Sequence, residues 1–172
     1  MKNEKGLTLV EILAAAMITS VVSILVFSIL VNSLKTYERT LDQNALRSEA
    51  DYIMSYLLKE IYATKNSQIT EVVKQTDSNK ESYLQIKTNQ GEQKIGFIHN
   101  ATTNQLEIKI KEQTLQISNS KIKLNNNSRI EDNSPGFFTV HLIFDLNGKS
   151  TEFVNNISSF SDNSENGGEN NE

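Results

Sequence analysis

The sequence predicts an α+β protein in which one long amino-terminal helix precedes a β-rich domain. Two observations carry this prediction. No charged residue lies between Glu11 and Lys35, so the early part of the chain is apolar enough to cross a membrane as a helix. After Ser67 the apolar residues alternate with polar ones, which is typical of strands with one buried face and one face in water. We expect the second half of the helix to pack on a largely antiparallel sheet.

Composition excludes several classes of function. The chain has 172 residues, a net charge of −4 and no cysteine, which excludes disulfides, thiolate metal sites and cysteine nucleophiles. The acidic balance argues against a general nucleic-acid surface. His99 and His141 supply all the imidazole and lie on strand-like runs without a supporting motif. We therefore predict no catalytic residue, no cofactor site and no metal site, and a protein that is not an enzyme.

The apolar segment at residues 12–34 reads ILAAAMITSVVSILVFSILVNSL. About 20 apolar residues at ~1.5 Å each span the ~30 Å hydrocarbon core. The few hydroxyl side chains can bond back to their own helix. Lys2 and Lys5 precede the segment, which favours an amino terminus in the cytoplasm and a single-pass protein whose carboxy-terminal domain lies outside. A cleaved secretory signal is disfavoured, because the small residues at 14–16 fall in the middle of the apolar run.

A carboxylate stands near the start of this segment, in the pattern Gly6-Leu7-Thr8-Leu9-Val10-Glu11. The short charged leader, this pattern and the apolar helix resemble the amino terminus of type IV pilins and pseudopilins. The resemblance implies that a prepilin peptidase in the cytoplasmic membrane cuts between Gly6 and Leu7 and methylates the new amino terminus. It also implies that Glu11 pairs with the terminal ammonium of a neighbouring subunit in the filament core. An unpaired buried carboxylate costs several kcal/mol, so such pairing can set the register between subunits.

The sequence departs from the family pattern at two positions, and the second departure favours a minor pilin or pseudopilin over a major pilin. Leu7 stands where phenylalanine is usual, which affects methylation more than cleavage. The helix-bending proline of many major pilins is absent, and Ser28 stands in its place. The Arg47, Glu49 and Glu60 spacing is similar to the J class of type II secretion pseudopilins, although these charges fit a solvated helix face equally well. The Asn-, Lys- and Ile-rich composition makes a competence-type pseudopilin the leading variant.

The rest of the chain is divided by its periodicity. We expect a leader at 1–6, a transmembrane and filament-core helix at 7–34, its amphipathic continuation at 35–66, a β-rich domain at 67–160 and a disordered acidic tail at 161–172. The predicted inner face of the continuing helix comprises Leu46, Ala50, Ile53, Met54, Leu57, Leu58 and Ile61. Alternating runs predict strands at 83–87, 94–98, 105–111, 114–117, 121–124, 137–146 and 151–154. Asn147-Gly148 predicts a two-residue hairpin, and Pro135-Gly136 predicts a loop before the longest strand.

The function implied by the resemblance is structural. The chain would join a type IV pilus-like, type II secretion or competence DNA-uptake filament, with the prepilin peptidase, other pilin or pseudopilin subunits and the cytoplasmic membrane as partners. DNA would be met only indirectly, through the filament. Lys109, Lys111, Lys121 and Lys123 form a basic stripe, but Glu107 and Glu112 reduce its potential. The alternative is a signal-anchored extracytoplasmic binding or adhesion domain that is neither cleaved nor polymerised.

Overall fold

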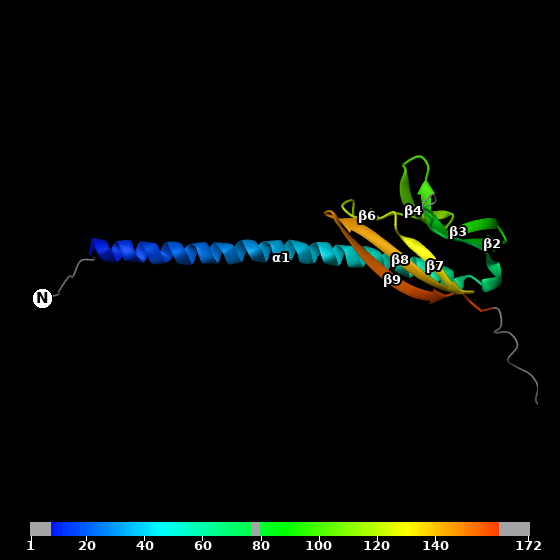
Figure 1. The fold of residues 1–172 in the computed structure, drawn as a ribbon, viewed down its shortest axis with the longest axis horizontal. Helices are drawn as coiled ribbons and strands as arrows, with labels where there is room; N and C mark the ends of the chain where they lie inside the picture. Colours follow the sequence, from blue (N-terminus) through cyan, green and yellow to red (C-terminus); the bar gives the residue numbers. More distant parts are fainter. Residues whose placement is uncertain (1–7, 77–79, 162–172) are drawn as a thin grey trace, which may run out of the picture. The chain divides into compact units, whose positions relative to one another are not determined.

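The computed structural model describes residues 8–76 and 80–161 and confirms the predicted α+β class (Figure 1). A single long helix, α1 (Leu9–Ala63), is followed by a short 3-10 helix, η1 (Asn66–Gln68), and then by strands only. The helix ends at Ala63 rather than at residue 66, because the chain becomes extended at Lys65. By its contacts the chain divides after Asn44 into two units.

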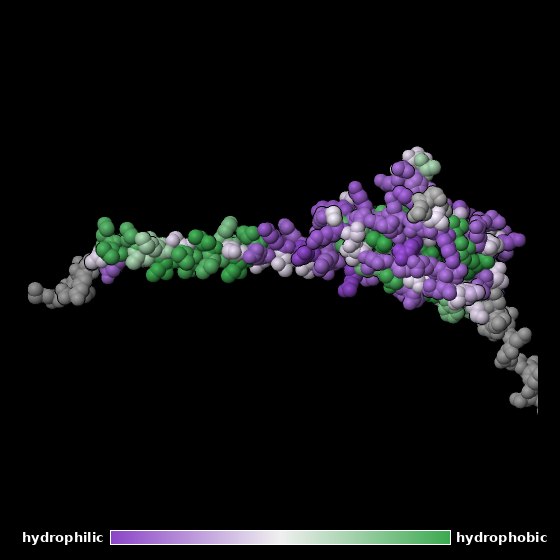
Figure 2. All heavy atoms as spheres, viewed as in Figure 1, coloured by the Kyte–Doolittle hydropathy of each residue, from purple (hydrophilic) through white to green (hydrophobic). Residues whose placement is uncertain are grey.

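In the first unit the helix is apolar and uncovered. Every side chain from Leu9 to Leu30 is exposed, and the most apolar stretch has a mean hydropathy of 2.5. Figure 2 shows these apolar residues gathered along the amino-terminal stretch of α1. By length and composition this helix can cross a membrane. An apolar surface of this extent is not stable in water, so lipid or other helices must cover it.

In the second unit the helix turns one face to the core. The buried residues recur at helical spacing, as predicted, and are Leu46, Ala50, Ile53, Met54, Leu57 and Ile61. Leu58 is half-buried against the same cluster. The reading of Arg47, Glu49 and Glu60 as a solvated helix face is wrong for Glu49, which is only 9% exposed. Its Oε1 accepts a hydrogen bond from the Ser118 backbone at 2.7 Å, which satisfies the buried carboxylate.

The first sheet is a five-stranded antiparallel meander whose spatial order follows the chain. Its strands are β1 (Ile69–Val73), β2 (Ser82–Thr88), β3 (Gly91–Asn100), β4 (Gln105–Lys111) and β5 (Gln113–Leu115). Alternate residues of β4, namely Leu106, Ile108 and Ile110, are buried, so one face of this sheet forms part of the core. Gly96 in β3 lies opposite Tyr83 in β2 with φ +141°, and no side chain fits there.

The second sheet is built around β8. Its strands are β6 (Lys123–Leu124), β7 (Arg129–Ser134), β8 (Phe137–Leu146) and β9 (Lys149–Ser158). All ten β8 residues pair with β9, so β6 and β7 share the other edge of β8. The predicted hairpin between β8 and β9 is confirmed: Asn147 and Gly148 have φ values of 52° and 74°, as a type I′ turn requires. The loop predicted at Pro135-Gly136 before the longest strand is a turn between β7 and β8.

The Ser82 hydroxyl links the two sheets. The buried Ser82 Oγ at the start of β2 accepts from the Ile130 backbone N–H at 2.8 Å and donates to the Ile130 carbonyl at 3.0 Å. Ile130 lies in β7 of the second sheet, and Ser82 lies in β2 of the first. The two hydrogen bonds therefore hold these strands together although they belong to different sheets. Around this link the aliphatic and aromatic side chains of both sheets and of the helix form one core cluster.

The sheet region differs from prediction in three respects. Two sheets form rather than one, and the expected strand at 121–124 is reduced to Lys123–Leu124. The strands β1 and β7 were not predicted. The β7 sequence Arg-Ile-Glu-Asp-Asn-Ser contains a single aliphatic residue, so it carries no alternating signal. Its position is set by pairing with β8 and by the Ser82 hydroxyl instead.

Candidate functional site

The amino end of α1 is closed by a capping box between Thr8 and Glu11. The Glu11 Oε2 accepts from the Thr8 backbone N–H and from the Thr8 hydroxyl, both at 2.9 Å. In return the Thr8 hydroxyl accepts from the Glu11 backbone N–H at 3.3 Å. This reciprocal arrangement satisfies two of the backbone donors that any helix leaves unpaired at its start. It also fixes the direction of the Glu11 side chain.

The capping role of Glu11 was not predicted. The sequence signal for it was present, because Thr8-Leu9-Val10-Glu11 has the Ser/Thr-x-x-Glu spacing of a capping box. The predicted site also included Gly6 and Leu7, which lie outside the described residues. The structure therefore places Glu11 and adds Thr8 beside it.

The surroundings of Glu11 are apolar. Its flanking residues Val10 and Ile12 are 73% and 58% exposed, and no described residue forms an ion pair with its carboxylate. Only Oε2 takes part in the hydrogen bonds to Thr8, so Oε1 has no donor among the residues the structure describes. Chemically, the arrangement offers an oriented anion at the end of an exposed apolar helix. Once lipid or neighbouring helices cover that helix, a cation brought to Glu11 is bound in a water-poor setting.

The two histidines lie in different sheets. His99 is in β3, and its backbone N–H donates to Glu81. His141 is in β8, where Nδ1 lies 2.7 Å from Glu152 Oε1 and Nε2 lies 3.4 Å from Glu131 Oε2. Within residues 8–76 and 80–161, no group of three or more metal-ligating side chains is suited to hold an ion. Both histidines are residues of the sheets, and His141 belongs to a charge cluster.

The charge cluster lies on the second sheet and consists of Arg129, Glu131, His141 and Glu152. Arg129 Nε donates to Glu131 Oε1 at 2.7 Å, and this hydrogen bond lowers the pKa of the Glu131 carboxyl. Arg129 also lies 3.9 Å from Glu152. The cluster links β7, β8 and β9 across their outer face, a role in holding the sheet together.

The lysine stripe does not form a free basic surface. Lys111 Nζ lies 2.6 Å from Glu60 Oε2 of the helix, so its charge is compensated. Lys123 lies directly across from Asp145 in the β6–β8 ladder. Glu60 and Asp145 therefore lower the positive potential of the lysine stripe further than the sequence alone led us to expect.

Comparison with known protein families gives a match at the amino terminus. Residues 1–30 match the family model described as the prokaryotic N-terminal methylation motif. No curated protein and no solved structure matches the chain. The matched residues include Thr8 and Glu11 and the first part of the exposed apolar helix. A motif of this kind implies processing by a prepilin peptidase and assembly with other pilin subunits, and together with the α+β fold it indicates a structural protein rather than an enzyme. This chain therefore has the prepilin-type amino terminus of the type IV pilins and pseudopilins.

Proposed function

We propose that this protein is a minor pilin or pseudopilin, cleaved after Gly6 and assembled through its apolar helix into a type IV pilus-like, type II secretion or competence filament. The observation that carries the proposal is the lone carboxylate of Glu11 in an exposed apolar helix that matches the methylation motif. Before assembly the helix at 7–34 is held in the cytoplasmic membrane, with the amino terminus inside and the β-rich domain outside. Residues 35–63 continue the helix, and 67–160 form the outer domain.

Cleavage creates the cation that Glu11 lacks. Cutting between Gly6 and Leu7 leaves an ammonium on Leu7, one residue before Thr8. In a filament, the ammonium of a neighbouring subunit meets the oriented Glu11 carboxylate within the helical core. Leaving that carboxylate unpaired would cost several kcal/mol, so subunits that align the two charges are favoured over those that do not.

The capping box supports a competing reading. In this reading the chain is an uncleaved anchored domain in which Glu11 only caps the helix, so Thr8 and Glu11 are equivalent members of one structural motif. Three variants, Thr8→Ala, Glu11→Gln and Gly6→Ala, distinguish the filament subunit from the uncleaved anchored domain. For each variant, amino-terminal processing and filament incorporation are measured in the native membrane. Loss of a cap costs about 1 kcal/mol at the helix end.

We expect intact mass and amino-terminal sequencing to give a chain that starts at Leu7, with or without one added methyl, and Gly6→Ala to block this processing. Glu11→Gln should be processed but reach the filament at least about tenfold less, whereas Thr8→Ala should be incorporated at nearly the normal level. A chain that starts at Met1 would contradict the proposal. Equal incorporation of Glu11→Gln and Thr8→Ala would assign Glu11 to capping alone.

A further inference from the structure

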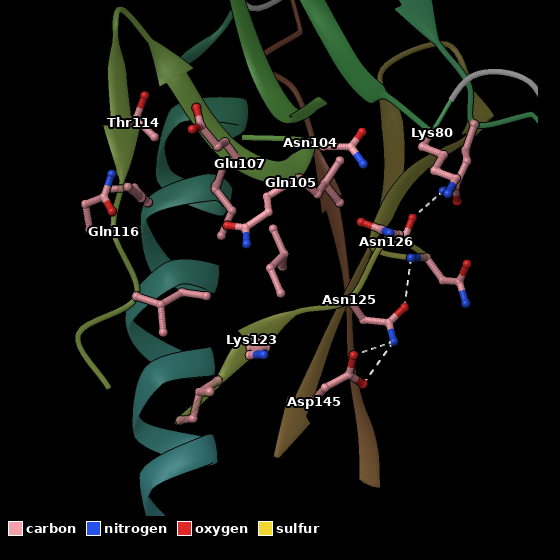
Figure 3. A pocket seen from close by; sticks show the side chains of 18 of the residues that line it. Lys80, Asn104, Gln105, Glu107, Thr114, Gln116, Lys123, Asn125, Asn126 and Asp145 are labelled. Atoms are coloured by element: carbon pink, nitrogen blue, oxygen red, sulfur yellow. Dashed lines mark hydrogen bonds between the residues drawn. The ribbon is translucent and has the colours of Figure 1, made fainter. Parts of the chain in front are cut away.

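A groove of about 1060 Å³ lies between the two sheets and is lined by residues of both (Figure 3). Its lysines, Lys80 and Lys123, are balanced by the acids Glu107 and Asp145. Both oxygens of Asp145 already accept hydrogen bonds from Asn125. The groove therefore leaves no net charge that would select a ligand. The uncovered amino-terminal part of α1 is more informative, because its length and its charged ends can be compared with the dimensions of a lipid bilayer.

Charged residues bound the apolar part of α1 at both ends. Glu11 precedes residues 12–34, Lys35 follows them, and no charged residue lies between. Six apolar residues within two turns of this stretch are each 51–68% exposed, namely Val21, Val22, Ile24, Leu25, Val26 and Phe27. Because two turns cover the whole circumference of a helix, α1 is apolar on all sides here, as a helix surrounded by lipid must be.

Three hydroxyl side chains in this stretch are satisfied by the helix itself. Thr19 donates to the Ala15 carbonyl at 2.8 Å, and Ser23 donates to the Thr19 carbonyl at 2.7 Å. Ser20 donates to the Met17 carbonyl, also at 2.7 Å. Hydrocarbon offers no water to such groups, so these internal hydrogen bonds lower the cost of contact with lipid.

Residues suited to a headgroup layer follow the apolar stretch. Lys35 and Arg39 lie about one turn apart, and Tyr37 between them is 63% exposed. Tyrosine is enriched at membrane interfaces, and long basic side chains lay their stems on apolar surface while their charge stays among the headgroups. Glu38 and Asp42 leave this region without net charge. The boundary is therefore set by the cost of taking any charge into hydrocarbon and not by attraction to anionic lipid.

The distance between the two charged ends decides which residues the hydrocarbon covers. Glu11 and Lys35 are separated by about 36 Å along the continuous helix, at ~1.5 Å per residue. The hydrocarbon core is ~30 Å thick, and membrane helices are tilted by about 20° on average. At that tilt the two residues lie about 34 Å apart along the bilayer normal, so with Lys35 at one edge of the hydrocarbon Glu11 lies beyond the other edge. A tilt above about 33° would be needed to bring Glu11 into the hydrocarbon.

We infer that the hydrocarbon of a bilayer covers residues 12–34 alone. Residues 35–39 lie in one headgroup layer, and the capping box of Thr8 and Glu11 lies in the other. Lipid therefore covers the helix without covering the Glu11 carboxylate, and a neighbouring helix is needed to take that carboxylate out of water. This position rests on the membrane anchoring in the proposed function, and not on cleavage or assembly. Its consequence is that the cost of burying Glu11 arises only at assembly, where the ammonium of a neighbour offsets it.

The test uses the full chain in vesicles of palmitoyl-oleoyl phosphatidylcholine and phosphatidylglycerol. The sequence has no cysteine, so one introduced cysteine can carry a spin label at a single position. Val10→Cys reports the level of the capping box, Val22→Cys the middle of the stretch and Thr36→Cys its other end. The depth of each label is measured from its collisions with oxygen, which enters hydrocarbon, and with a water-soluble nickel complex. Ser48→Cys, at an exposed position of the second unit, is the control for a label in water.

We expect the Val22 label within about 5 Å of the bilayer centre and the Val10 and Thr36 labels at least about 15 Å from it. Adding Glu11→Leu should move the Val10 label about 3 Å or more toward the centre, because no charge then bounds the stretch. Adding Thr8→Ala, which removes the cap but keeps the charge, should leave the depth of the Val10 label unchanged.

A Val10 label at hydrocarbon depth in the otherwise native chain would overturn the inference and leave membrane anchoring intact. So would an unchanged depth of that label in Glu11→Leu, because the charge would then not bound the stretch. A Val22 label as accessible to the nickel complex as the water control would overturn both the inference and the anchoring in the proposed function. Labels at the expected depths in a chain that is neither cleaved nor assembled would support the inference and contradict the proposed function alone.

Discussion

Replacing Ser82 with alanine tests how the two sheets are joined. The serine is fully buried, and Ile130 is 1% exposed. The change removes one oxygen and leaves both the N–H and the C=O of Ile130 without the partner that the structure gives them. Each buried backbone group left unpaired costs about 1–3 kcal/mol, so the loss of partners for these two groups should lower the free energy of unfolding by roughly 2–6 kcal/mol. That is a large fraction of the ~5–15 kcal/mol that stabilises an ordinary domain.

The assay is urea unfolding of the full chain in micelles, followed by tyrosine fluorescence, because the chain has five tyrosines and no tryptophan. Ser134→Ala is the matched control: it lies on the same strand as Ile130 but is exposed, and it should change stability by less than about 0.5 kcal/mol. A loss below about 1 kcal/mol for Ser82→Ala would refute the reasoning, because water or a shift of β7 would then supply the missing partners.

Two further predictions concern the sheets. Gly96→Ala should destabilise the protein by about 2–3 kcal/mol more than Gly91→Ala. A Cβ at Gly96 would lie 2.5 Å from the Ser82 carbonyl oxygen, whereas nothing lies within 4 Å of a Cβ at Gly91. Equal losses of stability in urea unfolding would contradict this prediction and show that a small backbone shift relieves the contact. Because the hydrogen bond from Arg129 lowers the pKa of Glu131 in the folded state, its stabilising effect is present above the unfolded pKa of about 4.3 and is lost as pH falls through the lower folded value. The stability difference between the native chain and Glu131→Gln should therefore shrink between about pH 5 and pH 3, and a constant difference over this range would contradict it.

Sequence reasoning succeeded where one strong periodicity fixed the answer. The helix face from Leu46 to Ile61 and the alternation in β4 and β8 follow from burial of a single face, and the structure confirms them. The turn at Asn147-Gly148 was predicted because few other dipeptides tolerate positive φ at both positions. These features depend on local sequence alone.

Features that depend on long-range partners could not be predicted. The burial of Glu49 could not be predicted, because the hydrogen bond that satisfies its carboxylate comes from Ser118, far along the chain. The strand β7 is held by β8 on one side and by Ser82 on the other, and nothing within its own sequence specifies either contact. The strands β5 and β6 pair over only three and two residues, although alternation predicted strands at 114–117 and 121–124.

The capping box and the proposed assembly contact of Glu11 are compatible, and the first strengthens the second. A capped glutamate has its side chain held by Thr8 through Oε2, so little rotational freedom remains to be lost when Oε1 meets a cation. The same hydrogen bonds partly satisfy the carboxylate when it enters apolar surroundings. A mobile glutamate at this position would lose both advantages. On this reasoning Thr8→Ala should weaken filament incorporation slightly, through orientation, whereas Glu11→Gln should abolish most of it, through charge. A Thr8→Ser variant, which keeps the hydroxyl, should behave like the native chain, and its failure to do so would show that Thr8 acts through its methyl group instead.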